Sequence, residues 1–383
     1  MRDFRPIQNR YTAGLSQKSG YNPNRFNALD SGLSYIILLV LFTVIPYIVS
    51  FLIGGFLKTL SEYDYFLAMD ISIILSQSIV FFVALVYSVC RKVNPFSGGG
   101  YRAKWEGLNV LMCITLIMGI MMTFYYLHSQ FVNDTNEFVV SSVISDPKGT
   151  ILSLLFYLIA VPVFPAIFEE MMFRGIIMRG LEQFGSVFAI IVSGLMFALM
   201  HGNFGQLILQ FLGGVAIASV VIITKNYLLG CIMHFFNNFF SFAYSLLLQL
   251  PKILNWKGQF VIDAFLIIFG IIFLIIGIIY FAGLAFNNYK KKAAGKDTID
   301  KFEKKVYYIS STLETCNNTY EFVDRNVKVE MKNSKEYDDR VFLIHGAFRQ
   351  LNKKSNTALS YAILGVGILL AIVLIFTGYF GIL

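Results

Sequence analysis

Apolar residues in this chain come in long runs that short polar segments separate. Most runs are long enough to cross a bilayer core of ~30 Å as a helix that rises ~1.5 Å per residue. The pattern therefore predicts an all-α polytopic membrane protein with nine spans. They cover residues 34–57, 66–90, 108–127, 150–172, 187–201, 206–223, 228–248, 259–286 and 358–381.

Two polar segments divide the chain further. Residues 1–33 are polar and predict a cytoplasmic N-terminal tail, and residues 34–286 hold the first eight spans. Residues 287–357 form a hydrophilic insert, and short alternations within it, such as KVYYIS, are typical of strands. We expect a small cytoplasmic α+β or β module there, followed by a C-terminal span within residues 358–383.

Charged residues gather in alternate loops. Residues 91–107 carry four basic side chains and one acidic one, whereas 58–65 and 128–149 are each more acidic than basic. Because basic loops stay in the cytoplasm, this alternation predicts a cytoplasmic N-terminus and a C-terminus outside. The net charge of +8 is thus explained by basic loops that orient the chain in a lipid bilayer, and we expect no nucleic-acid partner.

The overall composition supports this class. Only 14% of residues are charged and 56% are hydrophobic, whereas a soluble domain has about 25% charged residues. The abundance of Asn, Lys, Ile and Phe is typical of an AT-rich genome and suggests a prokaryotic plasma membrane.

The segment FPAIFEEMMFRG contains Glu169, Glu170 and Arg174 within otherwise apolar sequence. A charged side chain near the bilayer centre costs about 2.5–3.5 kcal/mol on insertion scales, so these groups need partners. Glu170 and Arg174 are four residues apart, a helical spacing that favours an ion pair. Glu169 then points about 100° away and is free to face another element.

Further polar residues occur at membrane depth. His201 ends the span-like run GLMFALMH, and His234 and Asn238 share one helix face in GCIMHFFNN. These polar residues would fit a hydrolytic site. In such a site a carboxylate deprotonates water, an imidazole assists it, and side-chain donors stabilise an oxyanion. Taken singly, His201 also fits a packed histidine, and His234 with Asn238 fits hydrogen bonding between helices.

Three ordered motifs resemble those of the CPBP family of CAAX prenyl endopeptidases and bacteriocin-processing enzymes, also called the ABI domain. EExxxR is matched by Glu169, Glu170 and Arg174, and FxxxH by Phe197 and His201. HxxxN is matched by His234 and Asn238. The resemblance covers residues 150–250 and implies an eight-span CPBP-like helical core.

The resemblance also implies an intramembrane endopeptidase that hydrolyses a membrane-associated peptide or protein. By position, Glu169 would activate water with help from His201, while Arg174 would hold Glu170. His234 and Asn238 would form the oxyanion hole. Two histidines and a glutamate could also bind zinc, but no HExxH motif is present, which favours a site without a metal cofactor.

One alternative function and one question about the depth of the site stay open from the sequence. A non-catalytic scaffold or bacteriocin-immunity protein could use the same fold, and the insert at 287–357 could bind a cytoplasmic partner. The depth of the site is also in question, because a span that ends at residue 172 puts Glu169 near the inner face, far from His201. We expect the helix to restart at Pro165, which would place Glu169 deeper.

Overall fold

The computed structural model describes residues 26–57, 62–91, 93, 104–129, 147–253, 258–293 and 357–379. Every regular element in these ranges is helical, as the apolar runs predict. The elements are α2 (Ala28–Leu57), α3 (Glu62–Arg91), α4 (Gly107–Ser129), α6 (Pro147–Glu170), η1 (Met171–Ile177), α7 (Met178–Leu181), η2 (Glu182–Phe184), α8 (Ser186–Met200), α9 (Leu207–Thr224), α10 (Tyr227–Ile253), α11 (Gln259–Ala293) and α15 (Thr357–Tyr379).

Six of these helices contain stretches that are long and apolar enough to cross a membrane. They are Ala28–Val49, Ile73–Arg91, Gly107–Tyr125, Leu207–Thr224, Phe260–Lys290 and Ala358–Thr377. Helix α8 is apolar but shorter. The predicted class, an all-α polytopic membrane protein, is therefore confirmed, while nine as the number of spans stays a prediction.

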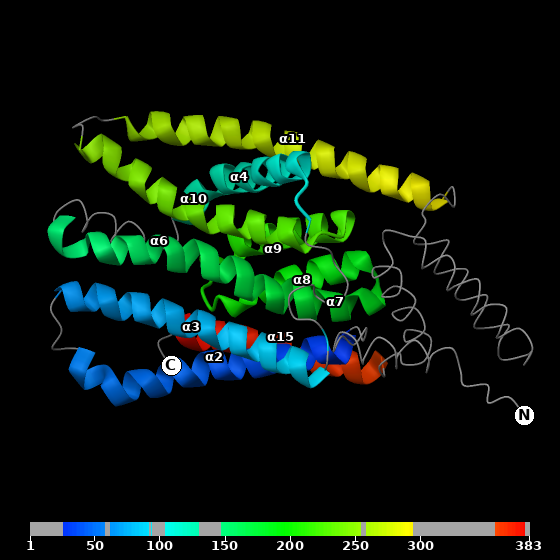
Figure 1. Cartoon of the computed structure of the whole chain (residues 1–383), viewed down its shortest axis with the longest axis horizontal. Helices are drawn as coiled ribbons and strands as arrows, with labels where there is room; N and C mark the ends of the chain where they lie inside the picture. Colours follow the sequence, from blue (N-terminus) through cyan, green and yellow to red (C-terminus); the bar gives the residue numbers. More distant parts are fainter. Residues whose placement is uncertain are drawn as a thin grey trace, which may run out of the picture.

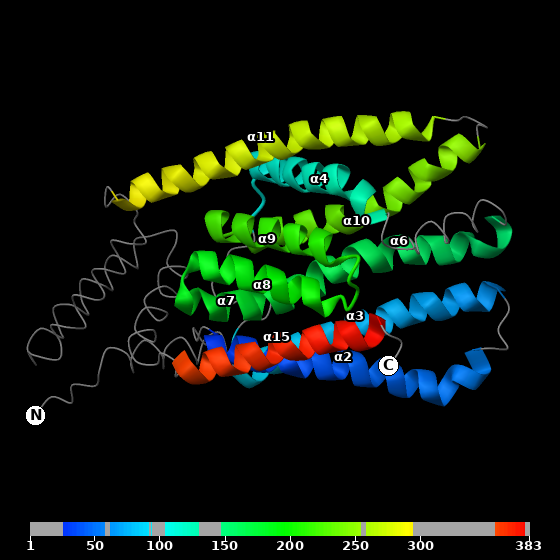
Figure 2. The same cartoon turned by 180° about the vertical axis from the view of Figure 1, so that it is seen from behind.

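The helices lie roughly along the long axis of the molecule and stack from one side to the other (Figures 1 and 2). Helix α11 packs along α4 at one side, and α15 packs on α2 at the other. Between them, α10 contacts α4, α6 and α9, and α6 contacts α3. The segment with the two glutamates thus lies in the middle of the bundle.

The C-terminal helix α15 is packed into this bundle. It contacts both α2 and α8. The ring of Tyr361 stacks on that of Phe184 with centroids 4.5 Å apart, and it meets Phe188 edge-on at 6.2 Å. Apolar residues of α15 (Leu364, Ala371 and Ile375) are buried in the core. The ninth predicted span therefore helps to fix α8.

The helix that carries Glu169 does not restart at Pro165, so that expectation is wrong. Helix α6 runs from Pro147 to Glu170 with both prolines inside it, and η1 and α7 continue the same path to Leu181.

The chain reverses at Gly185, where φ is +106°. Glu169 lies 16 residues before Gly185 and His201 lies 16 residues after it, which at 1.5 Å per residue is about 24 Å on each side. The two residues therefore lie at the same level.

Other boundaries also differ from those predicted. Helix α2 begins at Ala28, inside the expected tail, because a reciprocal capping box starts it. In this box Asp30 N–H donates to Asn27 Oδ1 at 3.0 Å, and Asn27 N–H donates to Asp30 Oδ2 at 2.9 Å. Helix α11 reaches Ala293, beyond the expected residue 286. The strands expected in the insert fall on residues 294–356, which lie outside the described ranges.

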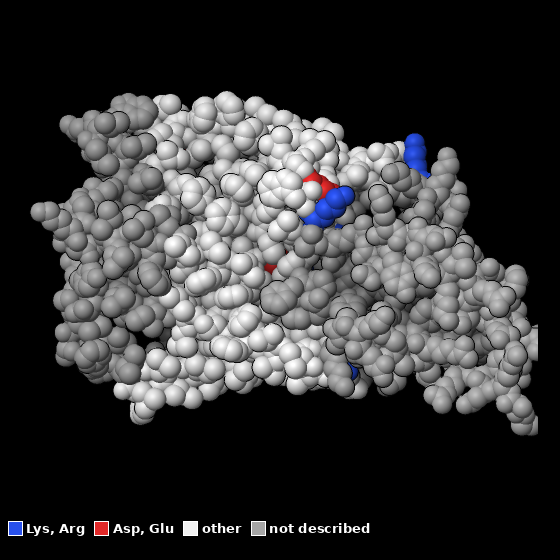
Figure 3. Space-filling model, in the orientation of Figure 1, with Lys and Arg blue, Asp and Glu red and all other residues white. Residues whose placement is uncertain are grey.

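Charged side chains are unevenly distributed along the long axis. Figure 3 shows no Lys, Arg, Asp or Glu on the described surface at the left of the view, and those visible lie from the middle to the right. Helix α3 ends, α4 begins and α11 ends towards the same end of the bundle (Figure 1), and Arg91, Lys104 and Lys290 belong to these parts of the chain. This end is the one that the loop charges predict to be cytoplasmic.

Close contact between α4 and α11 depends on glycine. A Cβ added to Gly270 of α11 would lie 2.7 Å from the backbone nitrogen of Thr123 in α4, whereas one added to Gly283 meets nothing within 4 Å. We predict that Gly270→Ala destabilises the protein by about 1–3 kcal/mol through overpacking. Its melting temperature in detergent should fall by several degrees, while Gly283→Ala on the same helix should leave it unchanged or slightly raised. Equal melting temperatures for the two variants would contradict this packing.

Candidate functional site

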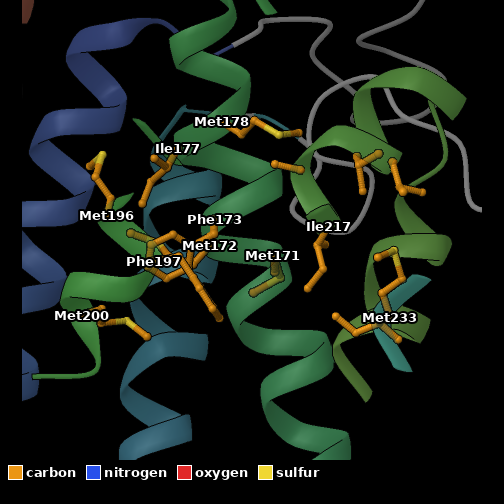
Figure 4. Close-up of a cluster of buried hydrophobic side chains, with 14 of the residues drawn as sticks. Met171, Met172, Phe173, Ile177, Met178, Met196, Phe197, Met200, Ile217 and Met233 are labelled. Carbon is orange, nitrogen blue, oxygen red and sulfur yellow. The ribbon is translucent and has the colours of Figure 1, made fainter. Parts of the chain in front are cut away.

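A π-helix, η1, follows directly after the two glutamates. It covers Met171–Ile177, and the N–H of Met178 reaches back five residues to the carbonyl of Phe173. All seven of its residues are buried. In Figure 4, Phe173 lies against Phe197 of α8, and Met171 lies on the side of Ile217 and Met233. Single π-helical turns are rare and are frequently found at functional sites.

The carboxylate of Glu170 is the centre of a fully buried network. Its Oε1 accepts from Arg174 Nη1 at 2.7 Å and from His234 Nδ1 at 2.8 Å. Arg174 Nη2 also donates to the carbonyl oxygen of Gly214 at 2.9 Å. The expected ion pair between Glu170 and Arg174 is thus present, and it connects η1 with α9 and α10.

Glu169 turns to the opposite side, towards α3. Its Oε1 accepts from Gln77 Nε2 at 2.8 Å. Its Oε2 lies 3.7 Å from His234 Nε2, too far for a hydrogen bond. Within the described part of the chain, this buried Oε2 has no hydrogen-bond partner. The two neighbouring carboxylates therefore have different surroundings, one with a cation and one with a neutral amide.

The ring of Phe197 packs against the rings of both His201 and His234. It lies 4.9 Å from the ring of His201 and 5.5 Å from that of His234, centroid to centroid. The guanidinium of Arg174 lies 4.9 Å from the same centroid, within cation–π range. The Phe of the FxxxH motif thus packs the site together.

The His201 imidazole has one nitrogen left for chemistry. Its Nδ1 lies 2.9 Å from the carbonyl oxygen of Phe197. A carbonyl only accepts, so Nδ1 carries the hydrogen and Nε2 of the neutral ring is an acceptor. Glu169 and His234 are both near enough to His201 to act on it electrostatically.

Asn238 makes a hydrogen bond to α6 that the HxxxN motif does not predict. Its Nδ2 donates to the carbonyl oxygen of Val161 at 3.1 Å, and its Oδ1 accepts from Asn237 Nδ2 at 3.0 Å. Val161 is four residues before Pro165, which has no N–H to offer it. The amide of Asn238 therefore satisfies a carbonyl that the proline leaves without its helical partner.

The structure thus brings four of the six predicted residues into one cluster. Glu170 is bonded to Arg174 and His234, Glu169 Oε2 lies 3.7 Å from His234 Nε2, and His201 joins them through Phe197. Asn238 lies one turn further along α10 and binds α6. The sequence analysis missed Gln77, although an amide within the apolar run 66–90 was a signal for it.

We also tested the residues of the cluster as zinc ligands. Across the ranges that the structure describes, no group of three or more His, Cys, Asp or Glu side chains is placed to hold a metal ion. Glu170 Oε1 is already bound by Arg174 and His234, and His201 Nδ1 is bound by a carbonyl. The geometry therefore provides no zinc ligand set in this part of the chain.

Arg174 should stabilise the fold chiefly by compensating Glu170, because the exposed fractions of their side chains are 1% and 0%. We predict that Arg174→Met costs about 3–5 kcal/mol, since it leaves a buried carboxylate unpaired. The double variant Arg174→Met/Glu170→Gln should regain much of the lost melting temperature in detergent. A double variant no more stable than Arg174→Met would show that the charge pair is not the cause.

Comparison with known proteins agrees with this site. Residues 151–240 match the family model described as type II CAAX prenyl endopeptidase Rce1-like. The match covers less than a quarter of the 383 residues, but it contains all three motifs and confirms the resemblance to the CPBP family. No curated protein and no solved structure matches the chain. This chain is therefore a helical membrane protein whose residues 151–240 are similar to the Rce1-like family of CAAX prenyl endopeptidases.

Proposed function

We propose that the protein is an intramembrane endopeptidase that hydrolyses a peptide bond of a membrane-associated protein or peptide. The observation that carries the proposal is the carboxylate of Glu169, whose Oε1 is held by a neutral amide and not by a cation, as that of Glu170 is, and whose buried Oε2 lies 3.7 Å from His234 Nε2 without a hydrogen-bond partner among the described residues. A carboxylate with one oxygen held and one oxygen free is suited to take a proton from water.

The reaction that fits this arrangement is general-base hydrolysis. Glu169 Oε2 removes a proton from a water molecule, whose oxygen forms a bond to the carbonyl carbon of the scissile peptide. The carbonyl oxygen gains the displaced electron pair and becomes an oxyanion. Collapse of the tetrahedral intermediate breaks the C–N bond, and the proton on Glu169 passes to the leaving nitrogen. The products are a carboxylic acid and an amine.

His234 is placed to stabilise the oxyanion. Its Nδ1 hydrogen is committed to Glu170, so Nε2 is the nitrogen that faces Glu169. When Nε2 carries a hydrogen, it can donate to charge that develops on the substrate. We assign Glu170 and Arg174 to holding this imidazole in place, and His201 to assisting Glu169.

Asn238 was expected to share the oxyanion hole with His234. Its contact with Val161 supports a positioning role as well, because it ties α10 to α6 at the proline. The second hydrogen of its amide is still available to a substrate carbonyl. We therefore keep Asn238 in the proposed site, with bracing of α6 as its role in the free protein.

The proposed setting is a prokaryotic plasma membrane with the N-terminus in the cytoplasm and the C-terminus outside. Arg91 at the end of α3, Lys104 just before α4 and Lys290 near the end of α11 belong to the same end of the bundle, which supports this orientation. The substrate would reach the site from the bilayer, and the insert at 287–357 would be free to bind a cytoplasmic partner.

The direct test is the loss of peptide products when Glu169 cannot act as a base. We predict that peptides present in membranes of cells with the wild-type protein disappear with Glu169→Gln, a loss of at least about 100-fold. Comparative mass spectrometry of the membrane peptidome measures this. Glu106→Gln serves as the matched control, because Glu106 lies just before α4, outside the site, and should leave the peptides unchanged.

Identical peptidomes for the wild type and Glu169→Gln would contradict the proposal. Together with an unchanged cellular phenotype, they would favour the non-catalytic scaffold or immunity protein instead.

A further inference from the structure

Gln77 of α3 is a buried polar residue that lies outside the three motifs and outside the matched residues 151–240. Only 8% of its surface is exposed. Its position is fixed by the packing of α3 on α6, since Phe81, one turn further along α3, lies against Phe168 with ring centroids 4.7 Å apart. Gln77 therefore faces Glu169 because of the way these two helices fit together.

The orientation of the Gln77 amide follows from its partner. An ionised carboxylate can only accept hydrogen bonds, so the NH₂ group of Gln77 faces Glu169 Oε1, at 2.8 Å. The amide oxygen must then point elsewhere. Among the described residues, neither Gln77 Oε1 nor Glu169 Oε2 has a hydrogen-bond partner, and both atoms are buried.

These two oxygens form a pair of acceptors without a donor. They belong to two side chains that are joined by one hydrogen bond. Buried polar atoms in native proteins are nearly always paired with protein or with water. Water is the smallest molecule that offers two hydrogens, and a buried water needs two or more polar partners.

We propose that Gln77 is a positioning residue that completes the site from α3. It holds Glu169 Oε1 and so keeps Oε2 free, and Gln77 Oε1 with Glu169 Oε2 binds the water molecule that Glu169 deprotonates. The assignment of this water as the nucleophile rests on the proposed function, whereas the water site itself does not.

A neutral amide is suited to this task. Glu170 is paired with a cation, because Arg174 Nη1 binds its Oε1 at 2.7 Å. Gln77 fixes one oxygen of Glu169 without adding a charge. The difference between the two partners would let two adjacent glutamates do different work.

The first test is kinetic. Gln77→Met has a similar volume but can neither hold Glu169 nor bind water through an oxygen. A peptide precursor identified by the peptidome comparison would be reconstituted with wild-type or variant protein in phosphatidylethanolamine–phosphatidylglycerol vesicles. We expect kcat to fall about 10–100-fold, because a small misplacement of a reacting group is costly, and KM to change less than twofold.

Two controls separate positioning from a structural effect. Ser78→Ala, on the next residue of α3, removes only a bond from Ser78 Oγ to the carbonyl of Ile74 in the same helix, and should leave kcat unchanged. In a Glu169→Gln background, Gln77→Met should cause no further loss, because its effect acts through Glu169. An unchanged kcat for Gln77→Met, or a full additional loss in the Glu169→Gln background, would overturn the inference.

The second test does not need activity. A high-resolution structure of the wild-type protein in lipid nanodiscs should show ordered water bonded to Gln77 Oε1 and Glu169 Oε2, and the Gln77→Met structure should have lost it. Wild-type density without this water would overturn the inference. Should the peptidomes show no proteolysis, the proposed function would fail, and the density would still decide whether the water site exists.

Discussion

The buried carboxylate of Glu170 is the interaction on which the rest of the site depends. It binds Arg174 of η1 and His234 of α10, and Arg174 extends the network to the backbone of α9. A lone carboxylate at this depth would be strongly destabilising, so its partners cannot separate without a large cost. Three segments of the chain are thus held in a fixed arrangement around one anion.

This arrangement explains the local geometry of the other residues. Because Glu170 fixes the Nδ1 side of His234, the Nε2 side is directed at Glu169. Because η1 continues α6 as far as α7, the helical hairpin reverses at Gly185 and brings His201 back to the level of Glu169. The ring of Phe197 then fills the space between the two histidines.

The sequence predicted the fold class and singled out the residues of the candidate site because both leave strong local signals. Apolar runs of bilayer length indicate spans, and charges or imidazoles within them stand out. The depth of Glu169 was not predictable in the same way, because Arg174 looked like the polar end of a span. In the structure Arg174 is 1% exposed and donates to Glu170 and Gly214 inside the bundle, so it does not mark the membrane surface.

Contacts between distant spans were the part that the sequence could not supply. Gln77 and Glu169 are 92 residues apart, and only the packing of α3 on α6 brings them together. Asn238 likewise meets Val161 across 77 residues, at a carbonyl freed by Pro165. Residue patterns give the types of groups available, whereas the pairing of groups depends on tertiary structure.

The central claim is that the two adjacent glutamates differ in role, Glu170 as the charged anchor of the fold and Glu169 as the free base. Melting temperatures of Glu169→Gln and Glu170→Gln, measured side by side in the same detergent, test it most directly. The account predicts that Glu170→Gln melts several degrees below the wild type, because Arg174 is left buried without its counter-charge, and that Glu169→Gln melts at or above it. Equal losses for both variants, or a larger loss for Glu169→Gln, would contradict the account.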